Sequence, residues 1–469
     1  MFSFRLVEHQ RLLLIIDFII IELTTLLALW IMAFRAGWVF DARYLTNYVE
    51  WFIFLPALWF ISAFLNGLYE PAVIADVGKS ARALLRVVIL VIIIYLAFYF
   101  FFATPGELPR GVVGYQGALS FVMVILWRAL YHALARQRSF ARRVIIVGAG
   151  WAGKTIAETI LQRAARHYHI VGFVDDDPLK QNQSLILGDV AVPVLGTSRD
   201  LPRLIHEHHV PEIILAVTHD LSAALFQAIL ASKEQGVHIT LMPVLFEQLT
   251  GMVPIEHIGD NWNVALPLDS PEASSFYRLA KRALDVLGAL IGLSLFLPLL
   301  PFIAVAIKLD SPGPVFFRQT RVGKGGKPFR LLKLRTMVAD AEPNGQAMRA
   351  QKNDPRITRV GRWLRKTRLD EMPQLFNVLK GEMSAVGPRP ERPEHLEELE
   401  RAIPFHRLRN AVKPGMAGWA AVNYDYVDSL EDARIRLQYD LYYIKHQSLW
   451  LDLQVLWRML LQVLALKGR

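Results

Sequence analysis

Residues 365–384 read RKTRLDEMPQLFNVLKGEMS, and GPRP follows at 387–390. Two adjacent acids, Asp370 and Glu371, stand among arginines and lysines, just before a proline and an apolar-periodic segment. Because proline is favoured in the first turn of a helix, the pattern predicts both acids at a helix N-terminus. The helix dipole and the free N–H groups favour anions there, either the carboxylates or a bound phosphate. A solvated helix cap with nearby ion pairs is the alternative interpretation of this stretch alone.

The composition indicates that part of the chain lies in a membrane. Hydrophobic residues make up 53% of the 469 residues and charged residues only 20%, and the length suffices for about two or three domains. The net charge of +10 suits an anionic lipid surface or a phosphorylated substrate. No nucleic-acid partner is expected, because no nucleic-acid-binding motif accompanies the charge. The absence of cysteine excludes disulfides and thiolate zinc sites.

Residues 1–140 predict a bundle of four transmembrane helices, since each apolar run approaches the roughly 20 residues that a bilayer core requires. The expected spans are Leu12 to Phe34, Tyr48 to Leu65, Leu84 to Phe102 and Tyr115 to Leu134. Basic residues concentrate before the first, between the second and third, and after the fourth. The positive-inside rule therefore predicts both ends of the bundle on the cytoplasmic side of a bacterial inner membrane. Asp17 and Glu22 are expected to face the bundle interior, where a helix–helix hydrogen bond is favoured over a transport role.

Residues 141–268 predict an α/β, Rossmann-like domain with a parallel sheet, because strand-like and helical patterns alternate. An apolar strand leads into a G-x-G-x-x-G loop made by Gly148, Gly150 and Gly153, and the next apolar strand ends at Asp175. These residues form a candidate cofactor site, where the glycines would let a nucleotide pyrophosphate approach the backbone. Catalytic partners for redox chemistry are not evident, so a regulatory domain without a bound dinucleotide is favoured.

Residues 269–469 predict a catalytic domain of α+β class that associates with the membrane. It begins with a long apolar run, residues 283–308, that Pro298 and Pro301 interrupt, and proline inside a helix kinks it. Strongly basic segments flank the run on both sides, so both flanks should be cytoplasmic. The pattern predicts a re-entrant helix broken at Pro298, and an ordinary fifth span is the alternative.

From Lys281 to the C-terminus the chain resembles the bacterial sugar transferase family. The matching motifs are KR-x-x-D at Lys281, SPGPVFF at Ser311, KLRTM at Lys333, DPRITRVGRWLRK at Asp354, LDEMPQLFNVLKGEMSAVGPRP at Leu369, KPGMAGW at Lys413 and YDLYYIKHQSLWLDL at Tyr439. The N-terminal spans and the α/β segment are similar to the long form of the polyprenyl-phosphate hexose-1-phosphate transferases in that family. Arg368 departs from the family pattern, which usually has a small polar residue there, as do Ala417, Ala421 and Tyr424. The last three departures, at Ala417, Ala421 and Tyr424, leave the sugar open.

The resemblance implies a two-step reaction. Asp370 would attack the sugar-bearing phosphate of a UDP-sugar, UMP would leave, and undecaprenyl phosphate would then accept the sugar phosphate. It implies Mg²⁺ held by Asp370 and Glu371, and exopolysaccharide or O-antigen synthesis as the pathway. The cations expected to bind substrate phosphates are Lys281, Arg282, Arg321, Lys333, Arg335 and Arg389. Membrane lipid is an expected partner, and a homodimer is the expected oligomer.

Two other functions remain open on the sequence. A membrane-tethered nucleotide-sugar dehydratase or epimerase would act through the α/β segment, but it needs a Tyr-x-x-x-Lys pair that Tyr168 does not provide. A non-catalytic scaffold of polysaccharide assembly would not require adjacent acids amid so many cations.

Overall fold

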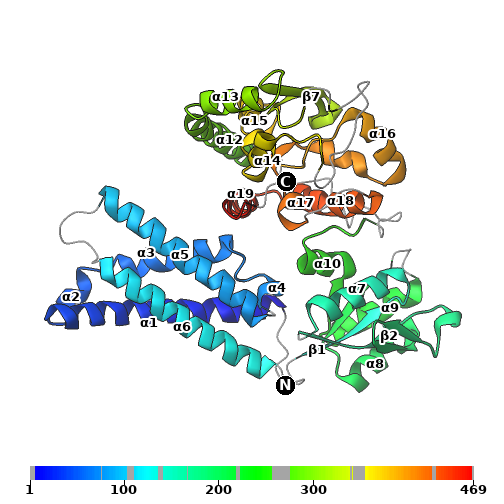
Figure 1. Ribbon diagram of the computed structural model, residues 1–469. Helices are drawn as coiled ribbons and strands as arrows, with labels where there is room; N and C mark the ends of the chain where they lie inside the picture. Colours follow the sequence, from blue (N-terminus) through cyan, green and yellow to red (C-terminus); the bar gives the residue numbers. More distant parts are fainter. Residues whose placement is uncertain are drawn as a thin grey trace. The chain divides into compact units, whose positions relative to one another are not determined.

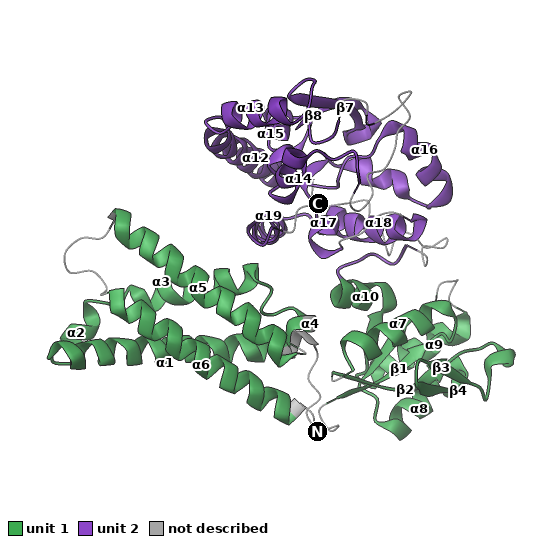
Figure 2. Ribbon diagram, viewed as in Figure 1, with its two compact units in different colours: residues 1–250 green, residues 251–469 purple. Residues whose placement is uncertain are grey.

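The computed structural model describes residues 6–74, 76–102, 110–135, 141–165, 167–217, 222–255, 275–338, 341, 354–424 and 429–466. The chain divides into two compact units, residues 1–250 and 251–469 (Figure 2). This division lies earlier than the predicted boundary at residue 268, which falls in the segment 256–274 outside the described residues. Val253 and Ile255 pack against Leu399 and Leu437 in the second unit, which explains the difference.

The first unit begins with long apolar helices (Figure 1). They are α1 (Leu6–Ala36), α3 (Trp51–Leu65), α5 (Val77–Phe102) and α6 (Arg110–Ala135), with the short α2 (Ala42–Thr46) and α4 (Pro71–Ile74) between them. Three of them, α1, α5 and α6, contain stretches long and apolar enough to cross a membrane.

The second predicted span is shorter than expected. Helix α3 has 15 residues and begins at Trp51 instead of Tyr48, because residues 47–50 form a turn. At about 1.5 Å per residue it is roughly 22 Å long, against about 30 Å of hydrocarbon. By length alone it does not cross as a straight helix.

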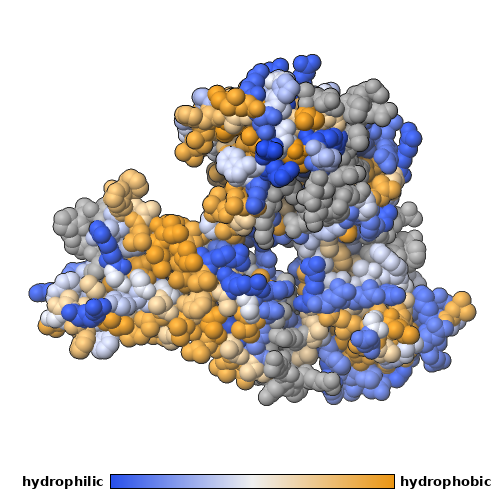
Figure 3. Space-filling view, viewed as in Figure 1, coloured by the Kyte–Doolittle hydropathy of each residue, from blue (hydrophilic) through white to orange (hydrophobic). Residues whose placement is uncertain are grey.

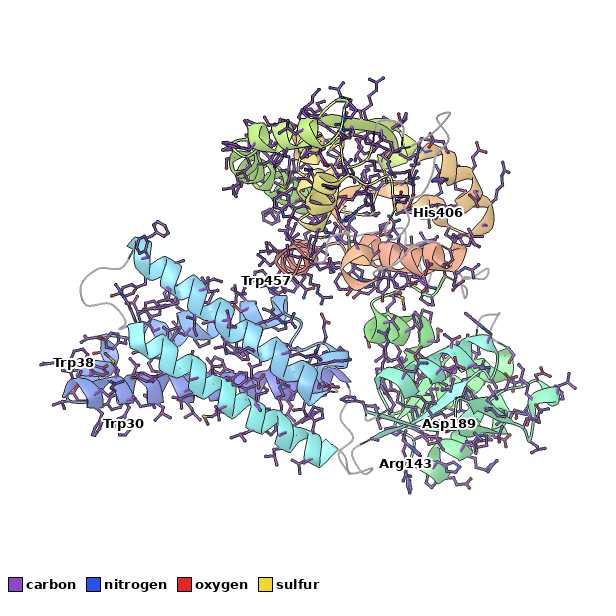
Figure 4. All side chains as sticks on the ribbon, viewed as in Figure 1. Trp30, Trp38, Arg143, Asp189, His406 and Trp457 are labelled. Carbon is purple, nitrogen blue, oxygen red and sulfur yellow. The ribbon has the colours of Figure 1, made fainter. Side chains whose placement is uncertain are left out.

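The helical part has an apolar exterior and a polar interior contact. Exposed apolar side chains cover α1, α5 and α6 (Figure 3), and Trp30 and Trp38 lie near one end of α1 (Figure 4). Asp17 is fully buried, 2.6 Å from Arg128 Nη2, and accepts a hydrogen bond from the Tyr69 hydroxyl at 2.8 Å. The inward orientation predicted for Asp17 is confirmed, and its partner is a charged arginine.

The rest of the first unit contains a six-stranded sheet of order β3-β4-β2-β1-β5-β6. The strands are β1 (Arg142–Val147), β2 (Tyr168–Val174), β3 (Ser184–Leu187), β4 (Val190–Gly196), β5 (Glu212–Leu215) and β6 (His238–Leu241). Neighbours pair in parallel except for the β3–β4 hairpin, which the sequence did not predict. The helices are α7 (Trp151–Arg163), α8 (Leu201–His208), α9 (Ala223–Glu234) and α10 (Met242–Thr250).

The second unit combines helices with two small sheets. Its helices are α12 (Ser275–Phe296), α13 (Leu300–Asp310), α14 (Arg359–Lys366), α15 (Gln374–Lys380), α16 (Pro393–Ala402), α17 (Trp419–Asn423), α18 (Leu430–Lys445) and α19 (Leu449–Leu464). The antiparallel hairpin joins β7 (Phe316–Val322) to β8 (Pro328–Leu334), and β9 (Ser384–Val386) pairs in parallel with β10 (Gly415–Ala417).

Helices α12 and α13 are bent by 63° at the break that contains Pro298. One face of the bent pair packs on the core of the second unit, through Ala289, Leu293, Phe296, Ile303 and Ile307. The other face exposes large apolar side chains (Figure 3). These are Leu287, Leu290, Ile291, Leu295, Leu297, Leu299, Phe302, Val305 and Leu309. An exposed surface of this composition is expected to be covered by an apolar environment.

Candidate active site

The acid pair lies in a tight turn between two helices. Helix α14 ends at Lys366, a 3₁₀ turn covers Leu369–Glu371, and α15 begins at Gln374 after Pro373. The acids therefore lie in the turn that leads into α15, and Pro373 is at the N-cap of that helix instead of in its first turn, where the sequence predicts it. Proline takes the N-cap position of a seven-residue helix, so a helix dipole contributes little here.

Three cations surround the carboxylate of Glu371. Lys333 of β8 donates to Oε1 at 2.8 Å, and Arg389 donates to the same oxygen at 3.1 Å. Arg368 Nη1 lies 3.8 Å from Oε2. Burial opposes the ionisation of Glu371, but Lys333 and Arg389 outweigh it and hold the pKa of Glu371 well below its usual range. Glu371 is therefore ionised and holds Lys333 and Arg389 in place beside it.

The neighbouring carboxylate of Asp370 has no such partner. Its residue is only 7% exposed, and among the described residues it accepts no hydrogen bond and forms no ion pair. Burial raises the pKa of Asp370 to about 6, although Lys333, Arg365 and Arg389 act in the opposite direction. A buried, weakly solvated carboxylate with free oxygens close to several cations has the properties of a nucleophile.

A network behind the acid pair fixes the segment that carries Arg389. Glu391 accepts hydrogen bonds from Arg409 at 2.8 Å and from Arg436 at 2.9 Å. Both arginines also donate to the backbone carbonyl of Arg389, and Arg409 reaches Asp440 at 2.8 Å. The side chain of Arg409 is only 4% exposed, whereas that of Arg389 is 45% exposed. The buried ion network therefore fixes the Arg389 backbone, while the Arg389 guanidinium remains accessible to solvent.

Arg321, one of the predicted phosphate-binding residues, lies beside this network. Its Nη1 donates to the carbonyl of Pro390 at 3.1 Å, next to Arg389 in the chain. Burial lowers the pKa of Arg321 to about 10, and the positive charge of Arg389 adds to that effect. The environment is electropositive, although within the described residues no hydrogen bond or ion pair joins Arg321 to the acid pair.

Three other predicted phosphate-binding cations have structural partners away from the acid pair. Lys281 contacts Asp452 at 2.8 Å, the Tyr443 hydroxyl and the Val386 carbonyl, which use all three ammonium protons. Lys281 is therefore committed to structural contacts within the second unit.

Arg282 and Arg335 both donate hydrogen bonds to backbone carbonyls at or just after helix ends. Arg282 donates at 2.7 Å to the carbonyls of Val378 and Leu379 at the end of α15. Arg335 donates to Ser311 and Pro312 after α13. Such capping contacts stabilise helix ends and leave these donors committed. The geometry does not support direct substrate binding by Lys281, Arg282 or Arg335.

Two arginines near the acids were not singled out as site residues. Arg365 donates to Thr336 at 2.8 Å and contributes positive charge at Asp370. Arg368 adopts the left-handed region, with φ of 56°. The sequence offered one signal for Arg368, its departure from the family pattern, but none for the backbone conformation.

In the glycine loop of the first unit, a backbone N–H already binds the side chain of Asp175. Asp175 Oδ2 accepts a hydrogen bond from the backbone N–H of Ala149 at 2.7 Å, between Gly148 and Gly150. Gly153 is required for packing, because a Cβ there would lie 1.9 Å from the Gly148 carbonyl oxygen. An acid that binds the loop is not free to bind a ribose hydroxyl.

A divalent cation fits the acid pair only in part. Among the described residues no three acidic or histidine side chains form a cluster that could hold a metal. Glu371 is engaged through Oε1, while Asp370 keeps its oxygens free. Mg²⁺ is commonly held by one or two carboxylates plus substrate phosphates, and the pair meets that lower requirement.

Comparisons with known proteins agree on the class. Residues 276–466 match the family model described as bacterial sugar transferase, and residues 64–243 match the one described as CoA-binding domain. The chain is 33% identical over 371 residues to the UDP-glucose:undecaprenyl-phosphate glucose-1-phosphate transferase of Xanthomonas campestris pv. campestris, covering 77% of this chain and 75% of that protein. A protein of the same name from Escherichia coli (strain K12) is 34% identical over 358 residues, 70% of this chain and 73% of that protein.

A further relative matches a smaller part of the chain. It is the UDP-N-acetylgalactosamine-undecaprenyl-phosphate N-acetylgalactosaminephosphotransferase of Aeromonas hydrophila, 47% identical over 219 residues. The alignment spans 47% of this chain and half of that protein's length. The named sugar differs between these relatives.

Proposed function

The chain belongs to the bacterial sugar transferase family and is a transferase, and from this premise we propose that it moves a sugar-1-phosphate from a UDP-sugar to undecaprenyl phosphate, releasing UMP. The supporting observation is the acid pair. Asp370 is buried without a partner, and Glu371 beside it holds Lys333 and Arg389. A diphosphate donor needs such a nucleophile and such charge neutralisation.

In the first step an oxygen of Asp370 attacks the phosphorus that bears the sugar. A phosphorus–oxygen bond forms to Asp370, and the bond to the bridging oxygen of the diphosphate breaks, so UMP leaves with that electron pair. In the second step a phosphate oxygen of undecaprenyl phosphate attacks the same phosphorus. The bond to Asp370 breaks, the carboxylate is restored, and a polyprenyl diphosphate sugar forms. Neither step requires a proton transfer when the acceptor is a dianion.

The cations have separate tasks in this scheme. Lys333 and Arg389 lie at 2.8 Å and 3.1 Å from Glu371, so their charges are held next to Asp370 before substrate arrives. Charges that are already oriented stabilise the developing negative charge on the bridging oxygen without reorganisation. Mg²⁺, held by Asp370, Glu371 and the donor diphosphate, would supply further charge neutralisation when bound.

We also propose that α12 and α13 form a re-entrant hairpin in the inner leaflet. Both of its ends are tied to the second unit. Lys281 near the start binds Asp452, and Asp310 at the end accepts a hydrogen bond from the backbone N–H of Val360 at 2.8 Å. One face of this helix pair packs on the core of the second unit, and the other face is apolar and exposed. Such a pair can insert into one leaflet of the bilayer without crossing it. That position would bring the acid pair near a lipid phosphate at the interface.

For the first unit we propose a membrane-anchoring and regulatory role in the bacterial inner membrane, with the catalytic unit on the cytoplasmic face. The hydrogen bond from Ala149 to Asp175 argues against a dinucleotide pyrophosphate on the glycine loop. Dehydratase or epimerase chemistry at this loop is therefore disfavoured. A homodimer and a role in exopolysaccharide or O-antigen synthesis remain predictions from the resemblance.

The test is UMP release by the purified full chain with Mg²⁺ and undecaprenyl phosphate, from UDP-glucose, UDP-galactose and UDP-N-acetylgalactosamine. Multiple turnovers of UMP release from one donor, dependent on the acceptor and abolished by Asp370→Asn, are expected. A Lys327→Met variant, altered in the exposed β7–β8 turn, serves as the matched control and should retain activity. Absence of release from every donor by a folded preparation would refute the proposed reaction.

A further inference from the structure

Arg368 combines a strained backbone with an unsatisfied side chain. It follows the last residues of α14 and adopts φ of 56° and ψ of 16°, the left-handed region that favours glycine after a helix. A side chain bearing a Cβ is disfavoured there. Backbone strain of this kind often accompanies a functional requirement.

The guanidinium of Arg368 also lacks hydrogen-bond partners. Arg368 Nε is buried and has no hydrogen-bond partner. The nearest counter-charge is Glu371 Oε2, at 3.8 Å from Nη1, which is beyond hydrogen-bond distance. Within the described part of the chain no hydrogen bond is made by any of its side-chain nitrogens. An arginine left in this condition beside an active site has capacity for a ligand that brings oxygen acceptors.

The charge around Arg368 indicates the chemical class of this ligand. Lys333 and Arg389 approach Glu371 from its Oε1 side, whereas Arg368 approaches from the Oε2 side. With Arg365, four cations face the two carboxylates of Asp370 and Glu371, so positive charge is in excess. The diphosphate of a nucleotide sugar carries two negative charges and is attracted to such a site.

We propose that Arg368 binds the diphosphate of the sugar-nucleotide donor with a bidentate guanidinium contact, and so sets donor affinity in this chain. The inference rests on the proposed function. It goes further because it assigns donor affinity to a position where the resemblance provides no cation. The acceptor phosphate is the competing source of the same chemistry, and the experiment separates the two.

The test uses Arg368→Gly, Arg368→Lys and the control Arg362→Ala, which removes an exposed charge from α14, the helix that precedes Arg368. Binding of UDP to the full chain is measured by titration calorimetry, which needs no turnover. Glycine relieves the strain, so Arg368→Gly should melt at the wild-type temperature or above it. Its UDP affinity should nevertheless fall about tenfold or more, while Arg368→Lys keeps part of the affinity and Arg362→Ala all of it.

Turnover then distinguishes donor from acceptor. In Arg368→Gly the KM for the UDP-sugar should rise while the KM for undecaprenyl phosphate stays constant. A rise confined to the acceptor, a UDP affinity within about twofold of wild type, or a lower melting temperature that accompanies the lost affinity would each overturn the proposal. A wild-type chain that binds UDP but releases no UMP would refute the proposed reaction and leave the Arg368 comparison intact. A wild-type chain that does not bind UDP would overturn the assignment of Arg368.

Discussion

Asp370 and Glu371 are consecutive in the chain and share the same cations, yet the pKa values of their carboxylates shift in opposite directions. Glu371 is bound by Lys333 at 2.8 Å and its pKa is held below the usual range, whereas burial raises the pKa of Asp370 to about 6. Neighbouring acids with divided pKa values commonly divide their roles. One is suited to attack phosphorus, and the other to hold the cations that make the attack possible.

The first prediction concerns the pH dependence of UMP release. Only the ionised form of Asp370 can attack, so the rate of the donor half-reaction should rise with pH through about 6 and then level off. Well below that pH the rate should fall by on the order of tenfold per unit. Single-turnover UMP release between pH 4.5 and 8.5 measures the profile. A rate that is already flat at pH 5 would contradict the raised pKa.

The second prediction concerns the stability of Asp370→Asn. A pKa raised from 3.8 to about 6 means that the folded state binds more protons than the unfolded state in that window. The contribution of Asp370 to stability therefore falls as pH rises from 3.8 through 6. Asparagine removes the desolvated charge, so above pH 6 the variant should be more stable by up to about 3 kcal/mol. Thermal melting at pH 5 and pH 7.5 checks this. Equal melting temperatures for variant and wild type at pH 7.5 would argue against it.

The third prediction concerns a double-mutant cycle on Lys333 and Arg389, the two cations that donate to Glu371 Oε1. Lys333→Met and Arg389→Met should each lower kcat/KM by about 100-fold, because each removes a charge held beside Asp370. Both contact the same oxygen, so their effects should not add. Steady-state kinetics of the two single variants and the double variant give the coupling. Strict additivity would mean that the two cations act independently of one another, against the shared role proposed for them at Glu371.

The sequence identified the acid pair and two of its cations but did not separate binding cations from structural ones. Lys281 and Arg335 resemble Lys333 in the sequence, since all three stand in basic motifs beside apolar segments. Their partners decide the difference, and these lie far along the chain. Asp452, for instance, is 171 residues from Lys281. Such pairings follow from the packing of α12 and α19 in three dimensions, which local patterns do not report.

The fold was predictable where periodicity is strong and less so where it is short. The parallel strands and the break at Pro298 follow from apolar runs and from proline chemistry. The β3–β4 hairpin was missed because β3 has only four residues, although Gly188 and Asp189 between the two strands are a two-residue turn signal. The start of α15 was misjudged because Pro373 caps that helix instead of entering its first turn.

The fourth prediction concerns Arg409, which holds the Arg389 segment. Lysine keeps the charge, but it cannot donate together to Glu391, Asp440 and the Arg389 carbonyl as the guanidinium does. Arg409→Lys should lose about 3 kcal/mol of stability, as expected when a buried ion network is broken. At a temperature where the variant is folded, kcat should fall more than the KM for the donor changes, since Arg389 remains but is less well oriented. An unchanged kcat in the folded variant would leave Arg409 a purely structural role.

The last prediction tests the hairpin formed by α12 and α13, and the absence of cysteine in the chain makes single-cysteine labelling clean. Ser275→Cys lies at the start of α12, and Lys324→Cys lies in the exposed β7–β8 turn beyond α13. A re-entrant path keeps both on the same side, so both should react with a membrane-impermeant maleimide in inverted vesicles and neither in intact cells. Leu295→Cys, on the exposed apolar face, should resist the reagent in membranes and react in denaturant. A spanning helix pair would instead put the first two cysteines on opposite sides, and that outcome would remove the structural reason for an acid pair working at the lipid interface.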